Sequence, residues 1–156
     1  PSQVCEVLSL FAGNTAELPI TLCALYGLRR SEAIGLQWKN VDFQRRLITV
    51  AATMQQGGGG CYLAEPKTES SYRTLPMMDS IYAILSAQKE RQKRNRAILG
   101  QGYIESDFVC TWDDGRLITP DYVTREFHKV IKKISVMGNY HTCTFIVFQK
   151  FFKPFC

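Results

Sequence analysis

The chain has 156 residues, of which 46% are hydrophobic, 21% charged and 12% aromatic. This composition is ordinary for a soluble globular protein, and the length fits one domain with a sizeable core. We find no signal peptide and no apolar run of membrane-spanning length, so we expect a cytoplasmic protein rather than a secreted or membrane-spanning one. The formal net charge of +5 favours an anionic partner such as nucleic acid without establishing one.

The cysteine pattern indicates neither a metal site nor a redox motif. The six cysteines form no CxxC pair, and no histidine lies at zinc-ligand spacing from two of them. Cys23 lies in an apolar helical stretch and Cys110 in an apolar extended one, which suits small buried hydrophobic residues. We therefore predict a reduced protein without a metal site.

The first part of the chain predicts three helices. Residues 1–13 carry an approximate helical stripe, and residues 16–26 are apolar nearly all round, as in a buried helix. Gly27 ends the second helix, and Ser31 is a good N-cap for a short third helix through Leu36. Arg29 lies at the break between them. Taken alone, this arginine most simply ends a helix and points its charge into water.

The middle of the chain predicts a small antiparallel sheet. A β-branched run at 47–53, an extended segment at 61–64 and another at 72–76 give three strands. The four glycines at 57–60 form a flexible turn rather than a phosphate loop, because neither a GK[ST] motif nor a helix follows. The polar turn at 66–71 contains Lys67.

Two longer helices follow the predicted strands. Asp79 or Ser80 is expected to cap a helix reaching about Leu99, and Ile81, Ile84 and Leu85 should face inward. The later half of this helix, residues 89–96, is strongly basic. This run fits a solvated helix face better than direct contact with phosphate, and both interpretations stay open.

The last helix is expected to start cleanly at Thr119-Pro120, with threonine as N-cap and proline in the first position. His128 on this helix is predicted to be a partly exposed structural residue. An apolar face on this helix is formed by Val123, Phe127, Val130, Ile131 and Ile134. Residues 135–156 have no acidic residue, many phenylalanines and no capped boundary, so we interpret them as foreign to the domain at 1–134.

In order and spacing, residues 1–134 resemble the catalytic domain of tyrosine recombinases, the phage-type integrases, and in particular integrases of Gram-positive conjugative transposons. The resemblance predicts an α+β fold, mainly helical with a small three-stranded antiparallel sheet. The segments that carry it are 17–19, 26–32 (Tyr-Gly-Leu-Arg-Arg-Ser-Glu), 35–38, 41–43, 66–68 (Pro-Lys-Thr), 70–76 and 118–127.

The resemblance implies a function and roles for particular residues. In this family a tyrosine attacks the scissile phosphate of double-stranded DNA and forms a 3′-phosphotyrosyl link, without metal, cofactor or small-molecule substrate. Arg29 matches the first of two arginines that hold the phosphate oxygens, and Lys67 matches the lysine that protonates the leaving 5′-oxygen. Glu32 matches an acidic residue that buttresses the arginine. Arg73 is expected to contact DNA together with Arg29 and Lys67.

The chain also departs from the family pattern. After Phe127 the His-x-x-Arg motif and the nucleophilic tyrosine are not recognisable, since His141 is followed at the arginine position by Thr144. A frameshift near Ser135 explains this most simply, and the family's N-terminal DNA-clamping domain is not recognisable either. We expect a bacterial, nucleoid-associated recombinase fragment that does not cleave DNA. The alternatives are a non-catalytic fragment that binds DNA or intact integrase protomers, and a relic without function.

Overall fold

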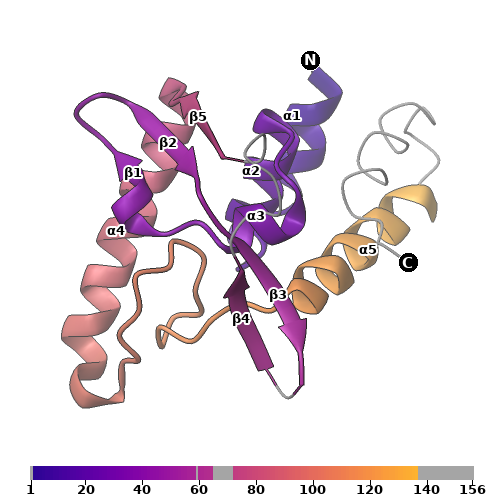
Figure 1. Cartoon of the computed structure of the whole chain (residues 1–156). Coiled ribbons are helices and arrows are strands. Elements are labelled where there is room, and N and C mark those ends of the chain that lie inside the picture. Colours follow the sequence, from indigo (N-terminus) through magenta and orange to yellow (C-terminus); the bar gives the residue numbers. More distant parts are fainter. Residues whose placement is uncertain (1, 59, 65–71, 137–156) are drawn as a thin grey trace.

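A computed structural model describes residues 2–58, 60–64 and 72–136 of the chain (Figure 1). Its elements, in chain order, are α1 (Ser2–Ser9), α2 (Glu17–Tyr26), α3 (Arg30–Ile34), the 3-10 turn η1 (Trp38–Asn40), β1 (Val41–Asp42), β2 (Leu47–Val50), β3 (Thr53–Gly57), β4 (Gly60–Ala64), β5 (Arg73–Pro76), α4 (Asp79–Leu99), the 3-10 turn η3 (Gly100–Gly102) and α5 (Pro120–Val136). Helices predominate and all of the described strand pairs are antiparallel, which confirms the predicted mainly helical α+β class.

The strands form one three-stranded sheet and one separate hairpin. The order in the sheet is β1–β2–β5, with Val50 opposite Arg73 at one end of the β2–β5 pair. In the hairpin β3 pairs with β4, from Thr53 opposite Ala64 to Gly57 opposite Gly60. Figure 1 shows the sheet alongside α4 and the hairpin extending away from it.

The predicted membership of the sheet is wrong in one respect. The run 47–53 is interrupted at Ala51 and Ala52, which separate β2 from β3. Because β3 ends at Gly57 and β4 begins at Gly60, these two strands pair locally as a hairpin. The segment 61–64 therefore does not join the three-stranded sheet, and β1 takes that place beside β2.

The hydrophobic core joins the start of the described domain to its end. The rings of Phe11, after α1, and Phe127, in α5, are stacked with centroids 6.1 Å apart, and both side chains are buried. Val123 and Ile131 are buried on the same face of α5, as predicted. The neighbouring His128 is exposed.

The long helix α4 buries two glutamines that the sequence reasoning did not single out. Ile81, Leu85, Gln88 and Gln92 are all buried, and their spacing of four, three and four residues places them on one face. The Gln92 amide donates to Thr111 Oγ1 at 2.8 Å and accepts from Trp38 Nε1 at 2.7 Å. The glutamines thus attach the 108–111 segment to α4. Extending the apolar spacing of the helix through its polar half could have identified them.

The helix starts follow the predictions in part. Thr119 Oγ1 accepts the Tyr122 N–H at 3.3 Å, which confirms it as the cap of α5. The α4 helix begins at Asp79, but its N-cap is Met78 rather than Asp79 or Ser80. The Met78 N–H donates at 3.0 Å to the hydroxyl of Tyr26, at the end of α2. The Asp79 carboxylate, which could have served as a local cap, instead forms an ion pair with Arg46.

Candidate nucleic-acid interface

Arg29 lies at a sharp break between two helices. Gly27 ends α2 in the left-handed conformation (φ 63°), which glycine adopts without steric cost, and its N–H donates to Cys23 O at 3.0 Å. The next side chain, Leu28, is fully buried. Arg29 then adopts an extended backbone (φ −66°, ψ 148°) as the N-cap residue of α3. With its neighbour anchored in the core, Arg29 has a side chain that is 61% exposed.

Glu32 is the acidic residue at the base of this arginine. One of its carboxylate oxygens accepts the backbone N–H of Arg29 at 2.9 Å, which satisfies a donor at the start of the helix. The predicted N-cap, Ser31, is therefore wrong, because α3 begins at Arg30, one residue earlier than a Ser31 cap would allow. The Glu32 side chain is buried, so its charge needs compensation from within the protein.

Arg73 supplies most of that compensation from another part of the chain. Its Nη2 donates to Glu32 Oε2 at 2.9 Å and its Nη1 to Oε1 at 3.3 Å, a two-point contact between β5 and α3. The Arg29 guanidinium is farther away, with Nη1 3.6 Å from Glu32 Oε1. We call these residues the Arg29–Glu32–Arg73 cluster. Two guanidinium groups face one carboxylate, which leaves a net positive site.

The structure brings together three of the four predicted site residues. Arg29, Glu32 and Arg73 meet in the cluster although Arg73 is 41 positions from Glu32. Lys67 is at 65–71, outside the described residues, so its role stays a prediction. Among the described residues, no group of three or more His, Cys, Asp or Glu side chains could hold a metal ion.

The basic stretch of α4 is partly engaged within the protein. Arg96 forms a two-point contact with Glu105 at 2.6 Å, which raises the pKa of the guanidinium further, and Arg91 Nε is 3.7 Å from Asp113. The Lys89 ammonium lies over the rings of Trp38 and Phe43. Lys93 and Arg94 are exposed. These pairings favour the solvated-face interpretation of the run over a dedicated phosphate site.

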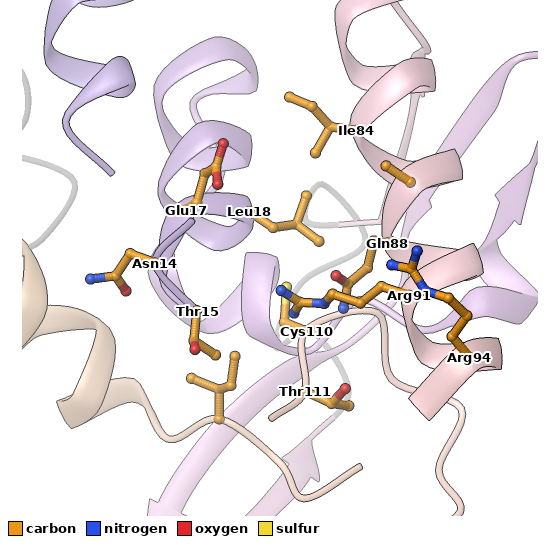
Figure 2. A pocket seen from close by; sticks show the side chains of 12 residues that line it. Asn14, Thr15, Glu17, Leu18, Ile84, Gln88, Arg91, Arg94, Cys110 and Thr111 are labelled. Atoms are coloured by element: carbon orange, nitrogen blue, oxygen red, sulfur yellow. The ribbon is translucent and has the colours of Figure 1, made fainter. Parts of the chain in front are cut away.

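A cavity of about 280 Å³ lies between the start of α2, the middle of α4 and the segment around Cys110 (Figure 2). Arg91 and Arg94 reach into it from α4, and Glu17 lies on the opposite wall. No member of the Arg29–Glu32–Arg73 cluster lines it. Two arginines and one carboxylate, Glu17, line it, and Asp113 outside the lining lies 3.7 Å from Arg91 Nε.

No helix in the described part of the chain is both long enough and apolar enough to cross a membrane.

Comparison with known proteins identifies a family match and sequence relatives of the chain. Residues 11–142 match the phage integrase family. A tyrosine recombinase XerC-like protein of Caldanaerobacter subterraneus subsp. tengcongensis is 27% identical and the match covers 86% of this chain and 37% of that protein. The transposase of transposon Tn916 from Enterococcus faecalis is 32% identical over 84 residues, which is 53% of this chain and 20% of that protein.

Solved structures agree with the sequence relatives. A Tn1549 transposon integrase in complex with circular intermediate DNA has a TM-score of 0.74 at 25% identity, covering 97% of this chain and 51% of that one. A complex of the same integrase with transposon right end DNA has a TM-score of 0.68 at 28% identity, covering 88% and 44%. The chain thus spans about half of these integrase chains, and less of the curated relatives. From the family match over residues 11–142, the chain belongs to the phage integrase family of tyrosine recombinases.

Proposed function

We propose that this chain binds the phosphate backbone of double-stranded DNA as part of a site-specific recombination and integration machinery. The observation that carries the proposal is the exposed Arg29 guanidinium, held at its base by the buried Glu32 carboxylate and next to a second guanidinium, Arg73. Membership of the phage integrase family supports it, as do the DNA complexes formed by the related Tn1549 integrase. On this proposal the protein acts with the bacterial nucleoid in the cytoplasm.

The chemistry of the site fits a phosphodiester. A guanidinium carries a permanent charge and a rigid fork of donors that matches the two non-bridging oxygens of a phosphate. The Arg29 backbone is fixed by its position as the N-cap of α3 and by its hydrogen bond to Glu32. Binding of a phosphate therefore costs less backbone conformational entropy than it would in a mobile loop. In the family's reaction such an arginine stabilises the charge that develops on the phosphate. Lys67 is assigned by resemblance to protonation of the leaving oxygen.

DNA binding is tested by titrating the full chain into a fluorescent duplex at several salt concentrations. We expect the affinity to fall steeply as salt rises, because each phosphate contact releases counterions. Arg29→Ala should weaken binding about tenfold or more, since a hydrogen bond to a charged group contributes about 1.5–3 kcal/mol. It should also flatten the dependence on salt by about one phosphate contact.

The matched control is Arg45→Ala. Arg45 has a side chain that is 81% exposed and pairs only loosely with Asp42 at 3.9 Å, so its removal costs the same formal charge at another place. Equal losses for the two variants would mean that DNA senses net charge alone and would reject Arg29 as a phosphate ligand. Absence of binding at low salt would favour a relic without function.

We further propose that the 156-residue chain by itself does not cleave DNA. The support is the unrecognised His-x-x-Arg motif and nucleophilic tyrosine after residue 134. Incubation with a nicked suicide substrate, followed by a denaturing gel, should show no covalent protein–DNA band. Such a band, mapped by peptide sequencing to one tyrosine, would overturn this part of the proposal.

A further inference from the structure

Two arginines compete for one buried carboxylate, and they share it unequally. Arg73 forms the short two-point contact with Glu32, at 2.9 and 3.3 Å, while Arg29 approaches only to 3.6 Å. Their exposures differ accordingly: the Arg73 side chain is 33% exposed and that of Arg29 is 61% exposed. The cluster therefore contains one guanidinium engaged by the protein and one directed largely toward solvent.

Electrostatics explains what would happen without Arg73. A buried carboxylate that loses its partner is costly, and the nearest remaining cation is Arg29, which precedes Glu32 by one helical turn. At 3.6 Å the two charges already form a long ion pair, which would shorten toward hydrogen-bond distance without Arg73. The hydrogen-bond donors of the Arg29 guanidinium and much of its charge would then be engaged by Glu32. Less of both would be left for a phosphate.

We propose that Arg73 is a positioning residue that neutralises Glu32 and thereby keeps Arg29 available to DNA. This inference rests on the proposed function, in which Arg29 binds phosphate. It adds a role for Arg73 that acts through Glu32 rather than through the DNA. A direct contact between Arg73 and DNA is the competing account, because the outer edge of its guanidinium is partly exposed.

Removing the charge of Glu32 distinguishes an action of Arg73 through Glu32 from a direct contact between Arg73 and DNA. Glu32→Gln keeps a carbonyl oxygen that can accept the Arg29 N–H but has no charge for Arg73 to neutralise. If Arg73 acts through Glu32, Arg73→Ala should weaken duplex binding about tenfold in the parent chain, a difference of about 1.4 kcal/mol. In the Glu32→Gln chain the same substitution should change the affinity by no more than about twofold, about 0.4 kcal/mol.

The competing account predicts a different pattern. If Arg73 contacts phosphate directly, Arg73→Ala should cost the same factor with and without the Glu32 charge, and this result overturns the inference. Arg73→Lys provides a second test, because it keeps the neutralising charge without the two-point geometry. We expect it to retain most of the affinity that Arg73→Ala loses, and a loss as large as that of Arg73→Ala would contradict charge neutralisation.

The same measurements distinguish failure of the inference from failure of the proposed function. If Arg29→Ala leaves binding unchanged, the proposed function fails. If Arg29→Ala weakens binding but Arg73→Ala does not, only the inference fails. Circular dichroism melts of every variant, with Arg45→Ala as the surface control, establish that folded chains are compared. Should Arg73→Ala unfold the parent chain, Arg73→Gln replaces it in both the parent and the Glu32→Gln chains.

Discussion

Residues of one type have different roles in this protein because their surroundings differ. Leu28 anchors the chain in the core, so the adjacent Arg29 is directed outward. Arg73 makes its short contacts with a buried carboxylate, and Arg46 lies over the ring of Tyr82 with its charge paired to Asp79. A permanent charge is common to all three arginines, so charge alone does not distinguish a phosphate ligand. What separates these three arginines is their exposure and the protein group that each one pairs with.

The buried thiols give a prediction at this scale. Burial raises the pKa of the Cys110 thiol from 9.0 to about 12, and burial together with the nearby Cys110 raises the pKa of Cys23 as well. At about pH 8, iodoacetamide should modify Cys5, which is exposed, but not Cys23 or Cys110 until denaturant is added. Peptide mass spectrometry resolves the sites. Modification of Cys110 as fast as Cys5 in the native chain would contradict this burial.

The same shift determines the sign of an alkaline effect on stability. The unfolded thiols ionise near their ordinary pKa of 9.0, whereas the folded ones keep their protons to higher pH. Between these values the unfolded state binds fewer protons, so the free energy of unfolding should fall as the pH rises above about 9. Melts of the parent chain and of Cys110→Ala should converge as the pH rises.

At the scale of elements, the position of α3 depends on a close approach to the start of β3. A Cβ atom on Gly35 would lie 2.9 Å from Met54 N and 3.2 Å from Ala52 O. Both are backbone atoms and cannot rotate away. The contact occurs where the run 47–53 breaks into two strands, and it sets the distance between the hairpin and the helix that carries Glu32.

Gly35→Ala should therefore destabilise the protein by about 1–3 kcal/mol through overpacking. Urea denaturation followed by circular dichroism measures the change. Gly60→Ala is the matched control, because a Cβ there meets no atom within 4 Å. We also expect Gly35→Ala to weaken DNA binding more than Gly60→Ala does, since it displaces α3. Equal stability of the two variants would mean that α3 can move aside without cost.

For the whole molecule, the Phe11–Phe127 stack joins the segment after α1 to α5. Both rings are buried, and they come from positions far apart in the chain. The domain therefore depends on a contact between its two ends, rather than on a series of local units. Loss of either ring should loosen α1 and α5 together.

Phe127→Ala should lower the free energy of unfolding by about 3–5 kcal/mol, the usual cost of removing a buried phenylalanine ring. Phe127→Leu should cost less, because leucine fills part of the volume. Ile98→Ala serves as a control, since Ile98 is 77% exposed and its truncation should change stability by no more than about 0.5 kcal/mol. A Phe127→Ala chain as stable as the Ile98→Ala chain would show that α5 is not needed to hold the core.

The sequence by itself determined the features that depend on neighbouring residues. Periodicity and local cap or glycine signals act within a few residues, and they determine the apolar stripe of α5, its cap at Thr119, the glycine break before Arg29 and the end of α4 at Leu99. They did not identify the N-caps of α3 and α4. The family resemblance extended this to the mainly helical α+β class, and the roles of Arg29 and Glu32 stay proposals. Lys67 and the boundary at 134 stay predictions.

Tertiary structure decided which distant groups meet. The sequence does not show which of several similar strands pair with one another. The prediction therefore placed 61–64 in the wrong sheet, and only the packing of the whole domain shows that β1 pairs with β2 there. Likewise, no local signal shows that Arg73 rather than Arg29 makes the close contact with Glu32, because that depends on the register of β5 beside β2. Pairings between distant residues depend on the geometry of the whole domain, and that geometry leaves Arg29 exposed.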